Sequence, residues 1–245
     1  MLSNVLHEGL GHGGACLLTG GRPLVLSTVH FECSADTLLV IAGGTLANLA
    51  AGCLFWGLLR LARHASVRLR FFLWLTMTIN LFEGGGYFLF SGVANIGDWS
   101  MFTQGFRPAW AWRVGLTVVG IVSYALFVWF ALLELRPLIG SDAVERQRRA
   151  KRLLIPPYLA GGILSCIAGM LNPVGMVLVA ISAAAASFGG TSGLAWMDNW
   201  LRFVPVGPET APATIGRSWL WLMAAAILSA GFILCLGPSV HFAAK

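Results

Sequence analysis

Charged residues are scarce in this chain. Asp, Glu, Lys and Arg together make up 11% of its 245 residues, whereas soluble domains carry roughly 25%. Hydrophobic residues make up 57%, and the mean hydropathy is +0.78. This composition excludes an ordinary soluble domain and indicates an integral, multi-pass membrane protein.

Several other signals are missing from the sequence. The 5 cysteines form no CxxC pair, so we expect them to be small buried hydrophobic residues. The N-terminus lacks the positive region of a signal peptide. His7 lies only about 10 Å of helix from Met1. This abrupt start leaves open whether a further segment precedes Met1. The net charge is +6, but the basic residues lie in short clusters between apolar runs, so no nucleic-acid partner is expected.

The apolar segments predict the fold class. We expect an all-α multi-pass membrane protein with about six membrane helices and a short β-hairpin after the first, over residues 22–33. The six segments cover residues 2–18, 37–61, 71–93, 114–135, 157–189 and 218–236. No internal repeat or linker separates domains. Residues 1–135 are predicted to form a membrane core, and residues 136–245 to add C-terminal membrane helices to the same domain.

Glycine, proline and arginine refine this picture. Three consecutive glycines at 84–86 predict a break in the third segment, and the stretch at 172–175 predicts a kink or break in the fifth. Arginines cluster at 60–70 and at 146–152. By the positive-inside rule both clusters are cytoplasmic, which places the hairpin and the loop over residues 94–112 outside.

The run HEGLGH at residues 7–12 is the strongest functional signal, because ionisable groups are costly in a bilayer. We interpret His7 and His12 as zinc ligands and Glu8 as a general base. The familiar HExxH spacing leaves two histidines about 40° apart on a helix, but a spacing of five separates them by about 140°. A one-residue π-bulge would realign them, and Gly9 and Gly11 make such a distortion cheap. Otherwise His12 points elsewhere and the site is vestigial.

A zinc ion held by two histidines needs a third protein ligand and an open position for water. The candidates are Asp98 and Glu83, the two carboxylates that follow the second apolar segment. Glu83 lies about as many residues before the outer end of its apolar segment as His12 lies before the end of its own, so the two would sit at a similar depth in the membrane. Asp98 follows the segment that contains the three glycines at 84–86, and these glycines could let the chain fold back toward the histidines. The residues alone leave both open.

The chain resembles the site-2-protease-like intramembrane zinc metalloproteases, in particular their short bacterial membrane-embedded relatives. Residues 7–13 and the LLTGG run at 17–21 are similar to the family's HE-x-GH helix and its glycine exit, with one extra residue. AGGTLAN at 42–48 is similar to AGPLAN, and INLF at 79–82 to the start of the NLLPxxPLDGG segment. The match covers roughly residues 5–99, and it implies that the membrane core over residues 1–135 is metalloprotease-like.

This resemblance implies a zinc-dependent endopeptidase that hydrolyses peptide bonds in or near the bilayer. The expected partners are membrane lipid and a transmembrane or membrane-associated peptide substrate, in a bacterial cytoplasmic membrane. The family's third ligand is an Asp that would fall at Phe88 here. The chain departs from the pattern at that position, and the residue type favours Asp98 over Glu83.

Asn80 and Asn48 are expected to support the site or bind substrate, or else to make ordinary hydrogen bonds between helices. Two other functions remain open. One is a catalytically inactive membrane scaffold or transporter-like protein that retains the fold. The other is haem ligation by two of the histidines, with His30 as a further candidate.

Overall fold

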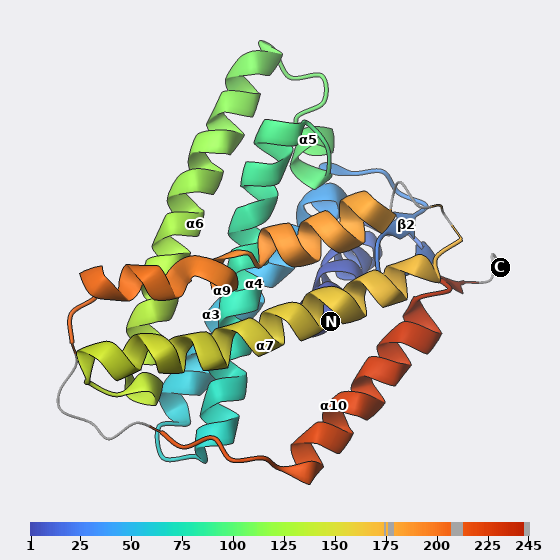
Figure 1. Cartoon of the computed structure of the whole chain (residues 1–245). Coiled ribbons are helices and arrows are strands. Elements are labelled where there is room, and N and C mark those ends of the chain that lie inside the picture. Colours follow the sequence, from blue (N-terminus) through green and yellow to red (C-terminus); the bar gives the residue numbers. More distant parts are fainter. Residues whose placement is uncertain (174, 176–178, 207–212, 243–245) are drawn as a thin grey trace.

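The chain is mostly helical in the computed structural model, which describes residues 1–173, 175, 179–206 and 213–242 (Figure 1). Helical elements dominate, and three short strands form one sheet. The helical elements are α1 (Leu2–Asn4), η1 (Val5–Gly13), α2 (Gly14–Leu18), α3 (Leu38–Leu61), α4 (Val67–Ala94), α5 (Asp98–Phe102), α6 (Ala109–Ile139), α7 (Ala143–Met170), η2 (Val179–Gly190), α9 (Gly193–Trp196), η3 (Met197–Phe203), α10 (Trp219–Gly231) and η4 (Phe232–Leu236). The strands are β1 (Pro23–Leu26), β2 (Phe31–Cys33) and β3 (Val240–His241).

Within the described residues, 4 helices are long and apolar enough to cross a membrane: α3, α6, Glu145–Met170 of α7, and Trp219–Leu236. This fits a helical membrane protein but not the six spans expected from the sequence. The helices over residues 2–18 are too short together for a bilayer. Helix α4 is long enough, but it is not among these four, and it carries the buried polar side chains of Asn80 and Glu83.

Helix α4 packs between α3 and α6 (Figure 1). The predicted break at residues 84–86 is wrong, because α4 runs through all three glycines. These glycines admit side chains from the neighbouring helices. A Cβ on Gly84 would lie 2.6 Å from Leu49 Cδ2, and one on Gly85 would lie 3.0 Å from Phe127 Cδ2. Glycine here serves close helix packing.

The core lies where these three helices meet. Its largest fully buried side chains include Trp74, Met77 and Phe82 of α4 and Leu132 and Leu135 of α6. The Trp74 indole Nε1 donates a hydrogen bond to the Ala131 carbonyl over 2.9 Å. The core therefore fixes α4 rigidly against α6, and α4 in turn supports the residues that precede α5.

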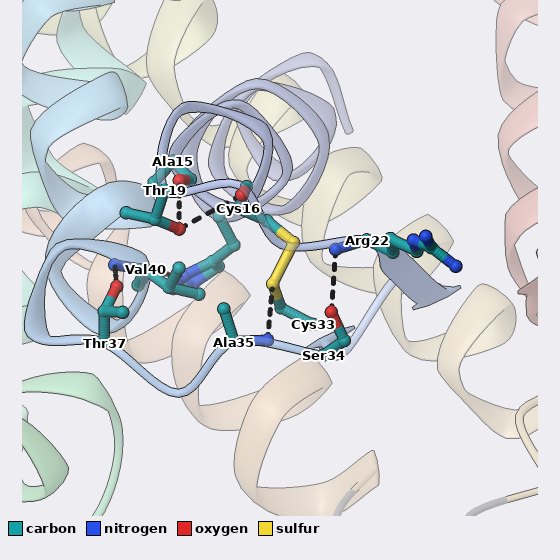
Figure 2. The surroundings of a disulfide bond; sticks show 10 residues. Ala15, Cys16, Thr19, Arg22, Cys33, Ser34, Ala35, Thr37 and Val40 are labelled. Carbon is teal, nitrogen blue, oxygen red and sulfur yellow. Dashed lines mark hydrogen bonds between the residues drawn. A yellow bond between two sulfur atoms is a disulfide. The ribbon is translucent and has the colours of Figure 1, made fainter.

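The predicted hairpin at residues 22–33 is confirmed. Strand β1 pairs antiparallel with β2, and β3, near the C-terminus, pairs with the other edge of β1. A disulfide joins Cys16 of α2 to Cys33 of β2 (Figure 2). The sequence predicts that the cysteines are small buried hydrophobic residues. Cys16 is buried but disulfide-bonded, Cys33 and Cys166 are only partly buried, and Cys53 and Cys235 are exposed, so that expectation is wrong for most of them. Disulfides persist in oxidising compartments, which agrees with the exterior placement expected for the hairpin.

Helix α7 runs across the direction of α4 and α6 (Figure 1). It begins at Ala143, so the basic cluster at residues 146–152 belongs to its first turns rather than to a connector. It ends at Met170, and η2 follows, so the predicted break near Asn172 is confirmed; Val174 of that stretch lies outside the described residues. The Arg146 guanidinium anchors the start of α7 by donating to the Leu201 carbonyl over 2.6 Å.

Candidate metal centre

The two histidines of the HEGLGH run lie on a π-helix. Element η1 has 9 residues in this conformation, in which hydrogen bonds run from residue i to i+5. Residues five apart therefore share one face. The rings of His7 and His12 lie 4.8 Å apart between centroids and meet edge to face. The expected realignment is present, although the distortion extends over the whole segment rather than one residue.

Close packing against α3 holds η1 in place. A Cβ on Gly11 would lie 2.6 Å from both the Gly43 oxygen and the Gly44 Cα, so two backbones touch here without side chains between them. A Cβ on Gly44 would lie 2.4 Å from His7 Nε2 and 2.6 Å from His12 Nε2. Helix α3 thus presents bare backbone to the two ring nitrogens.

Asp98 completes the cluster. It begins α5, directly after Gly97, whose φ of 84° turns the chain. The Trp99 indole donates a hydrogen bond to Thr45 Oγ1 over 3.0 Å and so fastens α5 to α3. Asp98 Oδ2 lies 3.2 Å from His7 Nε2 and 3.5 Å from His12 Nε2. The three potential ligand atoms all lie within 4.8 Å of one another.

The hydrogen-bond partners of His12 set its tautomer. Its Nδ1 lies 2.6 Å from the Val40 carbonyl oxygen, and because a carbonyl can only accept, Nδ1 carries the hydrogen. In the neutral ring, Nε2 then directs a lone pair at the Asp98 carboxylate. Asp98 Oδ2 is buried and accepts no well-directed hydrogen bond from any described residue. A cation between these two acceptors would satisfy both.

The distances from the Asp98 carboxylate to the two imidazoles match those around zinc. Bonds of about 2.0–2.1 Å in a tetrahedral site place neighbouring ligand atoms roughly 3.3 Å apart, close to the 3.2 and 3.5 Å found here. Two imidazoles and one carboxylate are also a donor set of catalytic zinc sites. Burial alone would raise the pKa of Asp98, but hydrogen bonds and charge from the His12 and His7 rings in their protonated form hold that pKa below its usual range. A divalent cation would take the place of those protons. The residues present therefore fit a divalent cation.

Glu8 is buried beside the cluster. It lines a cavity of about 10 Å³ together with His7, Val29, Glu83 and Tyr87, among others. This volume is about what one water molecule needs. The Tyr87 ring stacks on His7 with 4.6 Å between centroids and closes one side of the imidazole. The predicted base, one ligand and space for a water thus lie together.

Asn48 connects His7 to the alternative third ligand. Its amide Nδ2 lies 3.3 Å from His7 Nδ1 and donates to Glu83 Oε2 over 3.3 Å. Glu83 therefore reaches His7 through the amide, whereas Asp98 faces both Nε2 atoms directly. Ligation through His7 Nε2 requires a hydrogen on Nδ1. The Asn48 oxygen would accept that hydrogen after a half-turn of the amide, whose two orientations are nearly isosteric.

Two other residues considered from the sequence lie apart from the cluster. Asn80 is buried, but its amide donates to the Thr76 carbonyl within α4 over 2.8 Å. His30 lies at the hairpin turn, with Ser27 Oγ 3.0 Å from its Nδ1 and Glu32 Oε1 3.4 Å from its Nε2.

Three parts of the site were not expected from the sequence: the Val40 carbonyl, Gly44 and Tyr87. The small residues at 42–48 do signal a close approach of helices, but they do not say what approaches. Nothing in the local sequence marks Tyr87 or the carbonyl of Val40.

The cluster thus combines two ring nitrogens, a carboxylate oxygen without a hydrogen bond, and a second buried carboxylate beside a water-sized space. Any function proposed for it comes from this geometry. Comparison of the chain with known protein families, with characterised proteins and with solved structures found no match.

Proposed function

We propose that this chain is an intramembrane zinc-dependent endopeptidase. His7, His12 and Asp98 hold the metal, and Glu8 is the general base. The observation that carries the proposal is the approach of Asp98 Oδ2 to both Nε2 atoms, 3.2 and 3.5 Å away, with no well-directed hydrogen bond to that oxygen from any described residue. When bound, zinc would polarise the scissile carbonyl and acidify a water molecule.

Glu8 would move the proton. Its buried carboxylate lines the water-sized cavity next to His7. From there it accepts a proton from water during attack and returns that proton to the leaving nitrogen. Burial keeps other water away from the carboxylate, so its proton goes to the substrate rather than to bulk solvent.

The edge of the small sheet offers a place for substrate. Within the described part of the chain, β2 pairs only with β1, so its outer edge is available for another strand. Phe31 of β2 stacks on the His12 ring with 6.4 Å between centroids. A peptide added to this edge would be extended and would pass close to the metal ligands.

The proposed membrane topology follows from charge and disulfide. We place the arginine clusters at residues 60–70 and 146–152 in the cytoplasm, and the hairpin with its Cys16–Cys33 disulfide outside. The chain then crosses the membrane several times. Its location in a bacterial cytoplasmic membrane stays a prediction.

Replacing Glu8 with glutamine is expected to abolish cleavage while leaving bound zinc unchanged. The amide keeps the shape of the side chain but cannot accept the proton, which costs roughly 10²–10⁴-fold in rate. The purified full-length protein and a library of membrane-segment peptides, read by mass spectrometry, provide the measurement. Glu145→Gln, at the start of α7 and with a side chain that is 38% exposed, is the matched control. Equal cleavage by Glu8→Gln and the wild type would favour a non-catalytic scaffold instead.

Replacing Asn48 with leucine is expected to weaken zinc binding by roughly 10–100-fold, the usual effect of removing a hydrogen-bond partner of a metal-bound histidine. Leucine is close in size but cannot accept the Nδ1 hydrogen of His7. Competition with a fluorescent zinc chelator measures the affinity. The control is Asn199→Leu, at an exposed position. If both variants bind zinc as the wild type does, Asn48 does not orient His7.

A further inference from the structure

A second cavity lies far from the metal centre, where α3 ends, α4 begins and α6 approaches its end. Its volume is about 720 Å³. Four charged residues line it, Arg60, Arg63, Arg70 and Glu134, and the rest of its lining is leucine, glycine and proline. Arg60 follows Gly44 by about 24 Å along α3. This pocket, termed the arginine pocket, is therefore separate from the proposed active site.

The arginine pocket carries an unbalanced positive charge. Glu134 is already engaged, because the Arg60 Nη1 lies 3.4 Å from its Oε1 and the Trp56 indole donates to the same oxygen over 3.2 Å. Among the described residues, neither Arg63 nor Arg70 has an ion-pair partner. Three guanidinium groups face one carboxylate, so two positive charges remain for a ligand.

Arg70 supplies a more specific sign of a missing partner. Its Nε is shielded from solvent and makes no hydrogen bond with any described residue. A buried N–H of a charged group is costly when it has no acceptor. An anionic oxygen entering the pocket would satisfy it, and the planar fork of arginine matches the geometry of a phosphate.

The apolar lining indicates an amphiphile. Leu61, at the end of α3, lines the cavity and is 81% exposed, and Leu54, about two turns earlier, is 61% exposed. A free phosphate would leave this surface uncovered, whereas the acyl chain of a lipid would lie along it. Basic pockets between membrane helices on the cytoplasmic side are known binding places for anionic lipid headgroups.

We propose that the arginine pocket binds an anionic phospholipid. Arg63 and Arg70 hold the phosphate, Arg60 remains paired with Glu134, and the acyl chains lie against the exposed leucines of α3. The site depends on membrane residence but not on the peptidase chemistry, so loss of zinc or of Glu8 leaves lipid binding intact.

The test is titration of phosphatidylglycerol into the purified full-length protein in neutral detergent, with retained lipid counted by native mass spectrometry. The double variant Arg63→Gln/Arg70→Gln should bind the lipid at least tenfold more weakly, at about fivefold per arginine. The control Arg148→Gln/Arg152→Gln removes the same charge from α7, outside the pocket, and should change binding by less than about twofold. Equal binding by the two double variants would overturn the proposal.

Two further arms complete the experiment. The single variant Arg63→Gln changes an exposed side chain, so it tests the site even if the double variant does not fold, and about fivefold weaker binding is expected. Inorganic phosphate, compared with chloride at equal ionic strength, should not displace the lipid. Displacement by phosphate that depends on Arg63 would identify a free phosphate ester as the ligand and overturn the lipid assignment.

Discussion

Asp98→Asn is expected to remove zinc from the purified protein, whereas Glu83→Gln is expected to retain most of it. Asp98 Oδ2 faces both ring Nε2 atoms, 3.2 and 3.5 Å away. Glu83 reaches His7 only through the amide of Asn48. Losing a direct ligand should therefore weaken zinc binding by more than about 100-fold, the upper range for residues that only hydrogen-bond to a ligand.

Elemental analysis after dialysis against a weak chelator measures this difference. The two variants form a matched pair, because each replaces a buried or largely buried carboxylate with its amide. They also separate the two third ligands that the sequence leaves open. Zinc retained by Asp98→Asn and lost from Glu83→Gln would show that the assignment is reversed.

Gly44→Ala is expected to abolish both zinc binding and cleavage. The added methyl group would lie 2.4 Å from His7 Nε2 and 2.6 Å from His12 Nε2, well inside van der Waals contact. Both rings must then move away from Asp98, because the η1 backbone touches Gly43 and has no room to withdraw. Zinc affinity measured by chelator competition, and peptide cleavage, should fall below detection together.

The matched control is Gly57→Ala, in the same helix. A Cβ there meets nothing within 4 Å, and alanine is favoured over glycine in a helix by about 1 kcal/mol. This variant should bind zinc as the wild type does and should unfold at an equal or higher temperature. Wild-type zinc binding in Gly44→Ala would mean that the rings are not held against α3 as described.

The parts of the site that sequence reasoning could reach are those with local causes. A spacing of five between His7 and His12 requires a π-type distortion if the rings are to converge, and the nearby glycines permit one. The hairpin and the break near Asn172 follow from turn and helix-breaking residues in the same way. Asp98 is favoured by its residue type and by the glycines before it. The second reason is wrong, because α4 runs unbroken through those glycines and the chain turns only at Asn95 and Gly97.

The remainder depends on contacts between segments far apart in sequence. The glycines at 84–86 are expected to break a helix when considered alone, yet in α4 they admit Leu49 and Phe127 from neighbouring helices. Cys16 and Cys33 meet because the hairpin folds back on α2, which their separation of 17 does not reveal. Four candidate spans rather than six are found within the described residues, because residues 2–18 form only short helices and α4 carries buried polar residues among its apolar ones.

The central claim is that His7, His12 and Asp98 hold one zinc ion. Zinc-edge X-ray absorption of the purified full-length protein tests it most directly. We expect about one zinc per chain, with nitrogen and oxygen neighbours at about 2.0–2.1 Å and the scattering pattern of two imidazoles, all lost in His7→Ala. A protein without zinc, or a sulfur shell near 2.3 Å that persists in His7→Ala, would contradict the claim.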